Sequence, residues 1–366
     1  MTETTMAANQ ALLDVTIRHA VFLERLKAGE VAKFAPFLKQ IDRSLRERLN
    51  KAPLTDYNTK RLTKMLSDVD SLLLAIFSEY SDQLKLDLID LATYEAQFEA
   101  TSLTKAAPAT VSFEAAVPTV SAIRAAVLGN PLSIRGPDGG KLLEPFIKDW
   151  TAAERTRLTG AIRQGFFEGQ TNAEIIQKIR GTKALKYSDG LLAVTDRNAT
   201  TVVRTAIQHV ASQARMETAK ANSDVVLKIE LVATLDSKTS QICRTLDGKV
   251  FPIDSGPRPP FHPNCRTTFV MKTRLSEMFS QGATRAAVGA EGAGQVSADL
   301  SYYQWLQAQP DSFVQKALGP ARAKLFKSGG LSVKRFSELQ LDRQFKPLNL
   351  EQMKLLEPLA FERAGI

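Results

Sequence analysis

The sequence predicts an α+β protein that is predominantly α-helical. Apolar residues recur every three or four positions along much of the 366-residue chain, which is the period of an amphipathic helix. The alternation typical of a half-buried strand appears at residues 227–231, next to a loop-rich stretch. We therefore expect four parts in chain order: a helical hairpin or bundle over 1–105, an extended linker or arm over 106–140, a small mixed α/β module over 141–272 and a helical C-terminal module over 285–366.

Composition narrows the class of protein. Lys and Arg number 48 against 39 Asp and Glu, a formal net charge of +9, while hydrophobic residues make up 44% and charged residues 24% of the chain. These fractions are ordinary for a globular protein, and the positive charge fits either a solvated, slightly basic surface or an anionic neighbour such as nucleic acid. Two cysteines exclude a disulfide-rich secreted scaffold, and three histidines leave little material for a multi-metal enzyme.

The start of the chain bears on localisation. The first residues, MTETTMAANQ, have neither the basic region nor the apolar run of a secretory signal. No uninterrupted apolar run in the sequence approaches the roughly 18 residues that cross a bilayer. We expect a soluble protein made in a cytoplasm, with no membrane partner.

The N-terminal region predicts helices that pack against each other. Apolar positions over residues 8–49 step by three or four, and Gly29 and Pro36 interrupt the pattern, so we expect two shorter helices there. A turn and a helix cap (Thr55 or Asp56) follow at residues 52–56. The next helix has an almost unbroken apolar stripe over residues 62–84. This stripe suits an intramolecular core, and it also suits an interface with other copies of the chain or with a ring-shaped partner.

The middle of the chain returns to helices after a linker. Residues 101–140 are rich in Ala, Pro, Thr and Gly, which predicts an extended segment. Helical periodicity resumes over 143–179 in two pieces, the second beginning with a capping box at Thr171 and Glu174 and ending at Gly181. Two packed helices are the simpler interpretation of this unit, and a DNA-reading helix-turn-helix is the alternative.

The most unusual local composition lies between residues 236 and 266, after a helix expected over about 196–221 and the strand mentioned above. Both cysteines of the chain, Cys243 and Cys265, and one of its three histidines, His262, fall in this window. Such a concentration of rare residues indicates that this window carries a site.

The spacing within the window predicts how these residues meet. Asp247-Gly248 favours a tight hairpin turn followed by a short strand at residues 249–251. The proline-rich run at 256–260 cannot form a helix and makes a stiff loop. We expect this loop to deliver His262 and Cys265 back toward Cys243.

Four interpretations of this cluster remain open. The residues contribute to packing and hydrogen bonding only, or they bind zinc through Cys243, His262 and Cys265, with Asp236 or another oxygen as the fourth ligand. A disulfide is conceivable but disfavoured in a reducing cytoplasm. Catalysis by a Cys–His pair is the last option, for which no second histidine or carboxylate completes a triad.

The window also resembles the signature of the phage Mu F-like family of minor head, or head-morphogenesis, proteins. The matching pattern is Asp-x-x-Thr-Ser-x-x-Cys from residue 236, Leu-Asp-Gly-Lys-Val-Phe from residue 246 and Pro-Pro-x-His-Pro-Asn-Cys-Arg from residue 259. The resemblance is strongest over residues 196–271 and continues more weakly into 301–326.

The resemblance implies that the signature residues are structural rather than catalytic. They are Arg204, Asp236, Thr239, Ser240, Cys243, Asp247, Gly248, Pro260, His262, Pro263, Asn264, Cys265 and Arg266. Asp and Thr side chains are expected to hydrogen-bond backbone groups, and Arg266 to bridge carbonyls or the Asp236 carboxylate. Some members of the family have further cysteines at the positions of Ser240 and Thr267, and this sequence lacks both, which departs from the full ligand set. A structural zinc on Cys243, His262 and Cys265 is the candidate cofactor.

The resemblance further implies a function. It suggests a structural minor head protein of a tailed bacteriophage, bound at or near the portal vertex inside the capsid, acting in head assembly and in DNA packaging or ejection. The implied partners are the portal protein, capsid or scaffold proteins and packaged double-stranded DNA without sequence specificity. The chain is then not an enzyme, and the alternative class is a metal-dependent hydrolase or transferase that uses Cys243, His262 and Cys265.

The C-terminal part predicts a linker and small helices. Residues 282–297 are small and Gly-rich, which is typical of a flexible link. Helical spacing over residues 301–326 ends at Gly329-Gly330, and residues 350–361 predict one final amphipathic helix.

Overall fold

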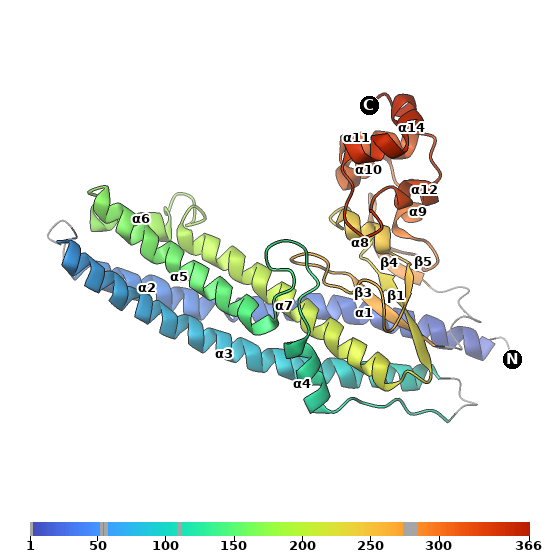
Figure 1. Ribbon diagram of the computed structural model, residues 1–366, viewed down its shortest axis with the longest axis horizontal. Helices are drawn as coiled ribbons and strands as arrows, with labels where there is room; N and C mark the ends of the chain where they lie inside the picture. Colours follow the sequence, from blue (N-terminus) through green and yellow to red (C-terminus); the bar gives the residue numbers. More distant parts are fainter. Residues whose placement is uncertain (1–2, 52–53, 55–57, 108–111, 274–283) are drawn as a thin grey trace.

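The computed structural model describes residues 3–51, 54, 58–107, 112–273 and 284–366. Long helices run side by side along the longest axis of the molecule, and a small sheet with a group of short helices stands at one end of them (Figure 1). The protein is therefore an elongated helical bundle with a compact α+β module at one end, which confirms the predicted fold class.

The helices of the bundle, together with the short helix α4 beside it, make up the first part of the chain. Their bounds are α1 Glu3–Ala32, α2 Ala35–Leu49, α3 Thr59–Ala106, α4 Val120–Gly129, α5 Leu143–Phe167, α6 Asn172–Arg180 and α7 Leu191–Ala221. Of the two expected interruptions, Gly29 lies within α1 and does not end it, whereas the break between the two helices falls at residues 33–34, just before Pro36. The caps predicted at Thr55 and Asp56 lie outside the described residues, and Asn58 caps α3 by accepting a hydrogen bond of 2.8 Å from the Arg61 amide.

The sequence signals around α6 are confirmed. Thr171 and Glu174 form the predicted capping box, and the helix ends at Gly181, whose φ of +94° favours glycine. Helix α7 begins at Leu191, a few residues before its predicted start. The unit over 143–179 therefore consists of two packed helices, α5 and α6, as the simpler interpretation had it.

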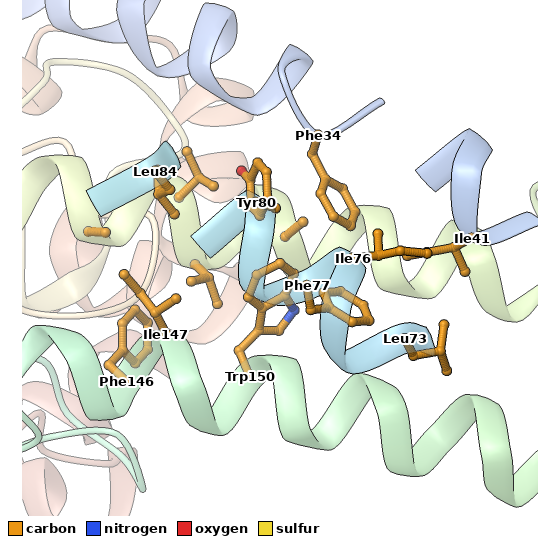
Figure 2. Packing of buried hydrophobic residues seen from close by; sticks show 14 of the residues in the cluster. Phe34, Ile41, Leu73, Ile76, Phe77, Tyr80, Leu84, Phe146, Ile147 and Trp150 are labelled. Carbon is orange, nitrogen blue, oxygen red and sulfur yellow. The ribbon is translucent and has the colours of Figure 1, made fainter. Parts of the chain in front are cut away.

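One continuous hydrophobic core runs through the bundle. Leu73, Ile76 and Tyr80 of α3 belong to the predicted stripe and are all buried. Around them, Phe34 lies against Tyr80 with ring centroids 4.9 Å apart, and Trp150 of α5 meets Phe77 edge-on at 5.6 Å (Figure 2). The apolar stripe is thus covered within the chain itself.

This core does not divide along the predicted domain bounds. The same cluster of buried residues contains members from α1, α2 and α3, from the 106–140 segment and from α5, α6 and α7. The expectation of an extended arm over 106–140 is wrong for residues 120–129, which form α4 and contribute buried Ile123 and Val127. The small residues of this segment allow α4 to pack closely on α3 and α7.

A three-stranded antiparallel sheet follows the bundle. Its strands are β1 Val226–Val232, β2 Val250–Pro252 and β3 Thr268–Thr273, in the order β2-β1-β3, with Ile229 opposite Phe251 on one side and Met271 on the other. The predicted strand is therefore the central one. Between β1 and β2 lies a short helix that the sequence did not indicate, α8 Gln241–Leu246.

The predicted hairpin turn at Asp247-Gly248 is wrong, because these residues join α8 to β2 rather than two strands. Gly248 still has the positive φ, +74°, that the dipeptide suggested. The Asp247 side chain is used differently from a turn residue: it accepts a hydrogen bond of 2.7 Å from the Ala233 amide at the end of β1.

The C-terminal part corrects two expectations. Of the predicted flexible link, residues 284–297 form a hairpin of β4 Thr284–Gly289 and β5 Gly292–Ser297, and the Val288 amide donates to the Leu235 carbonyl oxygen at 2.8 Å. The short helices that follow are α9 Tyr302–Gln307, α10 Asp311–Leu318, α11 Pro320–Ser328, α12 Val333–Glu338, α13 Leu350–Leu356 and α14 Pro358–Ala364. The single final helix predicted over 350–361 is two helices, since Pro358 cannot donate the backbone hydrogen bond that would continue the first.

Candidate functional site

The loop-rich window brings Cys243, His262 and Cys265 together as predicted. Cys243 lies in the first turn of α8, whose N-terminus Ser240 caps, and the other two residues lie in the loop between β2 and β3. The two sulfurs are 3.8 Å apart and unbonded, and Cys243 Sγ is 3.2 Å from His262 Nε2. Both thiols are buried, and the three ligand atoms all lie within 4.8 Å of one another.

The loop that carries His262 and Cys265 is held by helix α7. Asn264 has a φ of +58°, which asparagine tolerates better than most residues. Its amide donates to Thr205 Oγ1 at 3.0 Å, and its side chain donates to Thr201 Oγ1 at 3.3 Å. The Pro259-Pro260 peptide bond in the same loop is cis. Helix α7 thus fixes the position from which the loop presents Cys265.

The carboxylate of the signature residue Asp236 accepts hydrogen bonds from the backbone and from Arg266. Arg266 donates to both carboxylate oxygens of Asp236, at 2.7 and 3.0 Å, in the bridge expected from the sequence. Thr239 donates to the Thr234 carbonyl oxygen at 2.5 Å and to Asp236, whose carboxylate also accepts from the Lys238 amide. Desolvation by burial opposes ionisation of Asp236, but the hydrogen bonds and charge of Arg266, together with the hydrogen bonds from Thr239 and Lys238, outweigh it and hold the pKa of the carboxyl below its usual range.

The second signature acid, Asp247, is paired with a residue that the sequence did not indicate. Arg285 of β4 donates to its two carboxylate oxygens at 2.9 and 3.0 Å, and both side chains are buried. The same guanidinium also donates to the Ala233 carbonyl oxygen. Arg285 therefore joins the hairpin of the C-terminal part to the signature window.

A second group missed from the sequence lies on α1. Lys27 is 1% exposed, and its ammonium group donates to Glu24 and to Gln208 Oε1, both at 2.6 Å, and to the Cys265 carbonyl oxygen at 3.4 Å. Gln208 in turn donates to the Thr267 carbonyl oxygen at 2.9 Å. The signature residue Arg204, on α7, forms an ion pair with Glu24, which lies on α1 together with Lys27. The only sequence signal for this group is the spacing of Glu24 and Lys27, which does not predict burial.

The electrostatics of the cluster favour one thiolate. Burial opposes ionisation of Cys265, yet hydrogen bonds from Cys243 and from the His262 imidazole outweigh it and hold the pKa of Cys265 well below its ordinary value. The hydrogen bond with Cys265, together with burial, raises the pKa of Cys243. Burial lowers and the Cys265 thiolate raises the pKa of His262, and the raising effect prevails.

The three residues fit zinc in donor type and in spacing. Zn–S bonds of about 2.3 Å at a tetrahedral angle place two sulfurs about 3.8 Å apart, which is the separation observed here. His262 Nδ1 is 2.8 Å from the Pro263 carbonyl oxygen, so a proton on Nδ1 leaves the Nε2 lone pair directed at the sulfurs. A hydrogen bond from the second ring nitrogen to a backbone carbonyl oxygen commonly orients a histidine that binds a metal.

Asp236, which the sequence suggested as a fourth zinc ligand, is not free to bind an ion. Its carboxylate is engaged by Arg266 and Thr239, and among the described residues no fourth His, Cys, Asp or Glu joins the group of three. A zinc ion here would have three protein ligands and a water molecule or hydroxyl oxygen as the fourth.

The fold and the window together define the class of protein: it is elongated and mostly helical, with a small Cys/His module. In that module the signature side chains hold the backbone in place through buried hydrogen bonds. Residues 156–270 match the family model described as Phage Mu protein F like protein, so this part of the chain is a Mu F-like domain. That family comprises structural proteins of phage head morphogenesis, and the match supports a structural phage head protein.

The matched residues agree with the resemblance stated from the sequence. They begin within α5 and end within β3, and so include the whole signature window. No curated protein and no solved structure matched the chain. Among the described residues, no helix combines the length and the apolar character that a membrane span requires.

Proposed function

We propose that the protein is a minor head protein of a tailed phage, located inside the capsid at or near the portal vertex, where it acts in head assembly and in DNA packaging or ejection. Its partners are the portal protein, capsid or scaffold proteins and packaged double-stranded DNA bound without sequence specificity. The match of residues 156–270 to the Mu F-like family carries this proposal.

The way the signature residues are used supports a structural role. Asp236, Asp247 and Arg266 are engaged in hydrogen bonds that hold the loop, and both sulfurs of the cluster are buried. A nucleophile has to meet its substrate, so a fully enclosed thiol suits support of the fold better than turnover.

Quantitative mass spectrometry of purified particles tests the location. We expect the chain in particles of the phage that encodes it, at a few copies per particle compared with the major capsid protein. Removal of the gene should give heads that are malformed or poorly filled with DNA, as counted by electron microscopy. Absence of the chain from finished particles would contradict the proposed location.

We further propose that Cys243, His262 and Cys265 hold one structural zinc ion. The ion would cross-link α8 to the loop before β3, and it would offset the cost of keeping a thiolate in a buried site. This proposal is independent of the location in the head.

Metal analysis of the full chain tests the zinc site. We expect one zinc per chain in the purified wild-type protein. The His262→Ala and Cys265→Ser variants should contain almost no zinc and should melt at a lower temperature. Ser240→Cys supplies a third thiol, three residues before Cys243, as a fourth protein ligand and should strengthen zinc retention against a chelator. Normal melting of His262→Ala would contradict a supporting role for the cluster, and wild-type chain that neither contains nor takes up zinc would limit it to hydrogen bonding.

A further inference from the structure

The positive charge of the chain is concentrated in two segments. Residues 39–64 contain 8 Lys and Arg against 3 Asp and Glu, and residues 155–186 contain 7 against 2. The remainder of the chain contains 33 against 34. The net charge of +9 therefore originates entirely from these two segments.

The two segments form one end of the bundle. They comprise most of α2, the start of α3, the second half of α5, α6 and the beginning of the loop to α7, which lie together at the end away from the C-terminal helices (Figure 1). Asn172 joins them directly: its side chain accepts from the Leu54 amide at 3.0 Å and donates to the Leu49 carbonyl oxygen at 2.5 Å. We call this end, residues 39–51, 54, 58–64 and 155–186, the basic end.

The basic end contains a hollow of about 710 Å³ between α2, α6 and the loop after α6. Arg46, Arg180 and Lys183 line it, together with amide and hydroxyl side chains such as Asn50 and Thr182, and no Asp or Glu does so among the described residues. Asp42 lies 2.9 Å from Arg46 and 3.8 Å from Arg180, so one carboxylate faces two guanidinium groups. The surroundings of the hollow keep a positive charge.

Further cations flank the hollow. Arg43 lies one helical turn before Arg46 on α2, Lys51 follows Asn50, and Lys186 precedes Tyr187, which also lines the hollow. Arg43, Lys51, Lys183 and Lys186 are exposed, and the part of the chain that the structure describes offers them no ion pair. They are available to an external anion.

We propose that the basic end is the surface with which this protein binds the phosphate backbone of double-stranded DNA. Lys and Arg near a duplex displace its condensed counterions, and Asn, Gln and Thr side chains add hydrogen bonds to phosphate oxygens. The inference rests on the proposed function in one respect, since that function puts packaged DNA next to the protein. It adds which end of the molecule faces the DNA, and so leaves the opposite end, with the Cys/His module and the C-terminal helices, for protein contacts.

Two charge-matched variants of the full chain test the surface. The first variant replaces Arg43, Lys51, Lys183 and Lys186 by Gln. The second, the control, replaces four other residues by Gln: Lys105, Arg124, Lys316 and Lys324. These are also exposed and form no ion pair with a described residue. Both variants have the same net charge, so an effect of total charge alone would change them equally. Binding to two 30-base-pair duplexes of unrelated sequence is measured by fluorescence anisotropy over a range of salt concentrations.

We expect wild-type chain to bind both duplexes alike, with affinity that falls steeply with salt. The basic-end variant should bind at least about tenfold more weakly at 0.1 M salt, with a log–log salt slope shallower by about 2 to 4, because each lost phosphate contact removes about one unit. The control variant should stay within about threefold of wild type. Equal weakening of the two variants, or wild-type affinity of the basic-end variant, would overturn the proposal.

Chemical acetylation of the wild-type chain gives a readout that does not depend on any variant folding. DNA should protect Lys51, Lys183 and Lys186 from acetylation and leave Lys316 and Lys324 reactive, and the opposite pattern would refute the inference. The two proposals fail separately. A chain absent from particles that still binds DNA through its basic end contradicts only the location in the head, whereas a chain present in particles whose basic end is dispensable for DNA binding contradicts only this inference.

Discussion

At the scale of single residues, Arg215 of α7 shows how charge is stabilised inside the bundle. Its side chain is 1% exposed and lies 3.2 Å from Glu95 and 3.0 Å from Glu99 of α3, and it also donates to Thr268 of β3. Burial raises the pKa of Glu99, whereas the two carboxylates outweigh burial and raise the pKa of Arg215. This group connects the bundle with the sheet.

We predict that Arg215→Met lowers the free energy of unfolding by about 3 to 5 kcal/mol, because it removes the cation that pairs with Glu99 and leaves the buried Glu95 with only its contact to His19. Arg335→Met is the matched control, since Arg335 pairs with Glu357 at 2.6 Å on the exposed side of the C-terminal part. Its cost should stay below about 1 kcal/mol. Urea denaturation of both full-length variants measures the difference, and equal costs would show that the buried group adds nothing.

At the scale of elements, the packing of α6 on α5 depends on Gly165. A Cβ atom at this position would lie 2.5 Å from Cδ1 of Ile175, which is fully buried, whereas a Cβ at Gly160 of the same helix would meet nothing within 4 Å. The two glycines therefore differ in packing while sharing a helix.

We predict opposite effects of alanine at these two positions. Gly160→Ala should stabilise the protein by about 0.5 to 1 kcal/mol, because alanine favours the helix. Gly165→Ala should destabilise it by about 1 to 3 kcal/mol, since overpacking against Ile175 exceeds the same gain in helix propensity. Thermal melting of the two variants compares them directly, and stabilisation by both would mean that α6 moves away freely.

At the scale of the whole molecule, the parts that the sequence predicted well are those with a repeating or capped pattern. The stripe on α3, the capping box at Thr171 and the central strand over 227–231 all follow from local periodicity, which tertiary contacts then reinforce. The convergence of Cys243, His262 and Cys265 was also predictable, because a stiff proline-rich loop has few directions in which to return.

What could not be predicted depends on contacts between distant segments. The hairpin of β4 and β5 is rich in Gly and Ala, which have little strand propensity, and it forms next to Leu235, which the sequence did not connect with it. Lys27 and Arg215 are polar residues at core positions, and hydrophobic periodicity marks only apolar ones. Their burial follows from partners that lie more than a hundred residues away in sequence.

The contact from Lys27 to the Cys265 carbonyl oxygen has a consequence for inheritance. An exchange between related proteins that is limited to residues 156–270 would separate the lysine from both Gln208 and Cys265. A chimera of that kind would leave the buried ammonium group with Glu24 alone among these acceptors unless the incoming segment supplied equivalents of the other two. Helix α1 and the Mu F-like domain should therefore be inherited together, and viable junctions between related head proteins should fall before α1 or after β3.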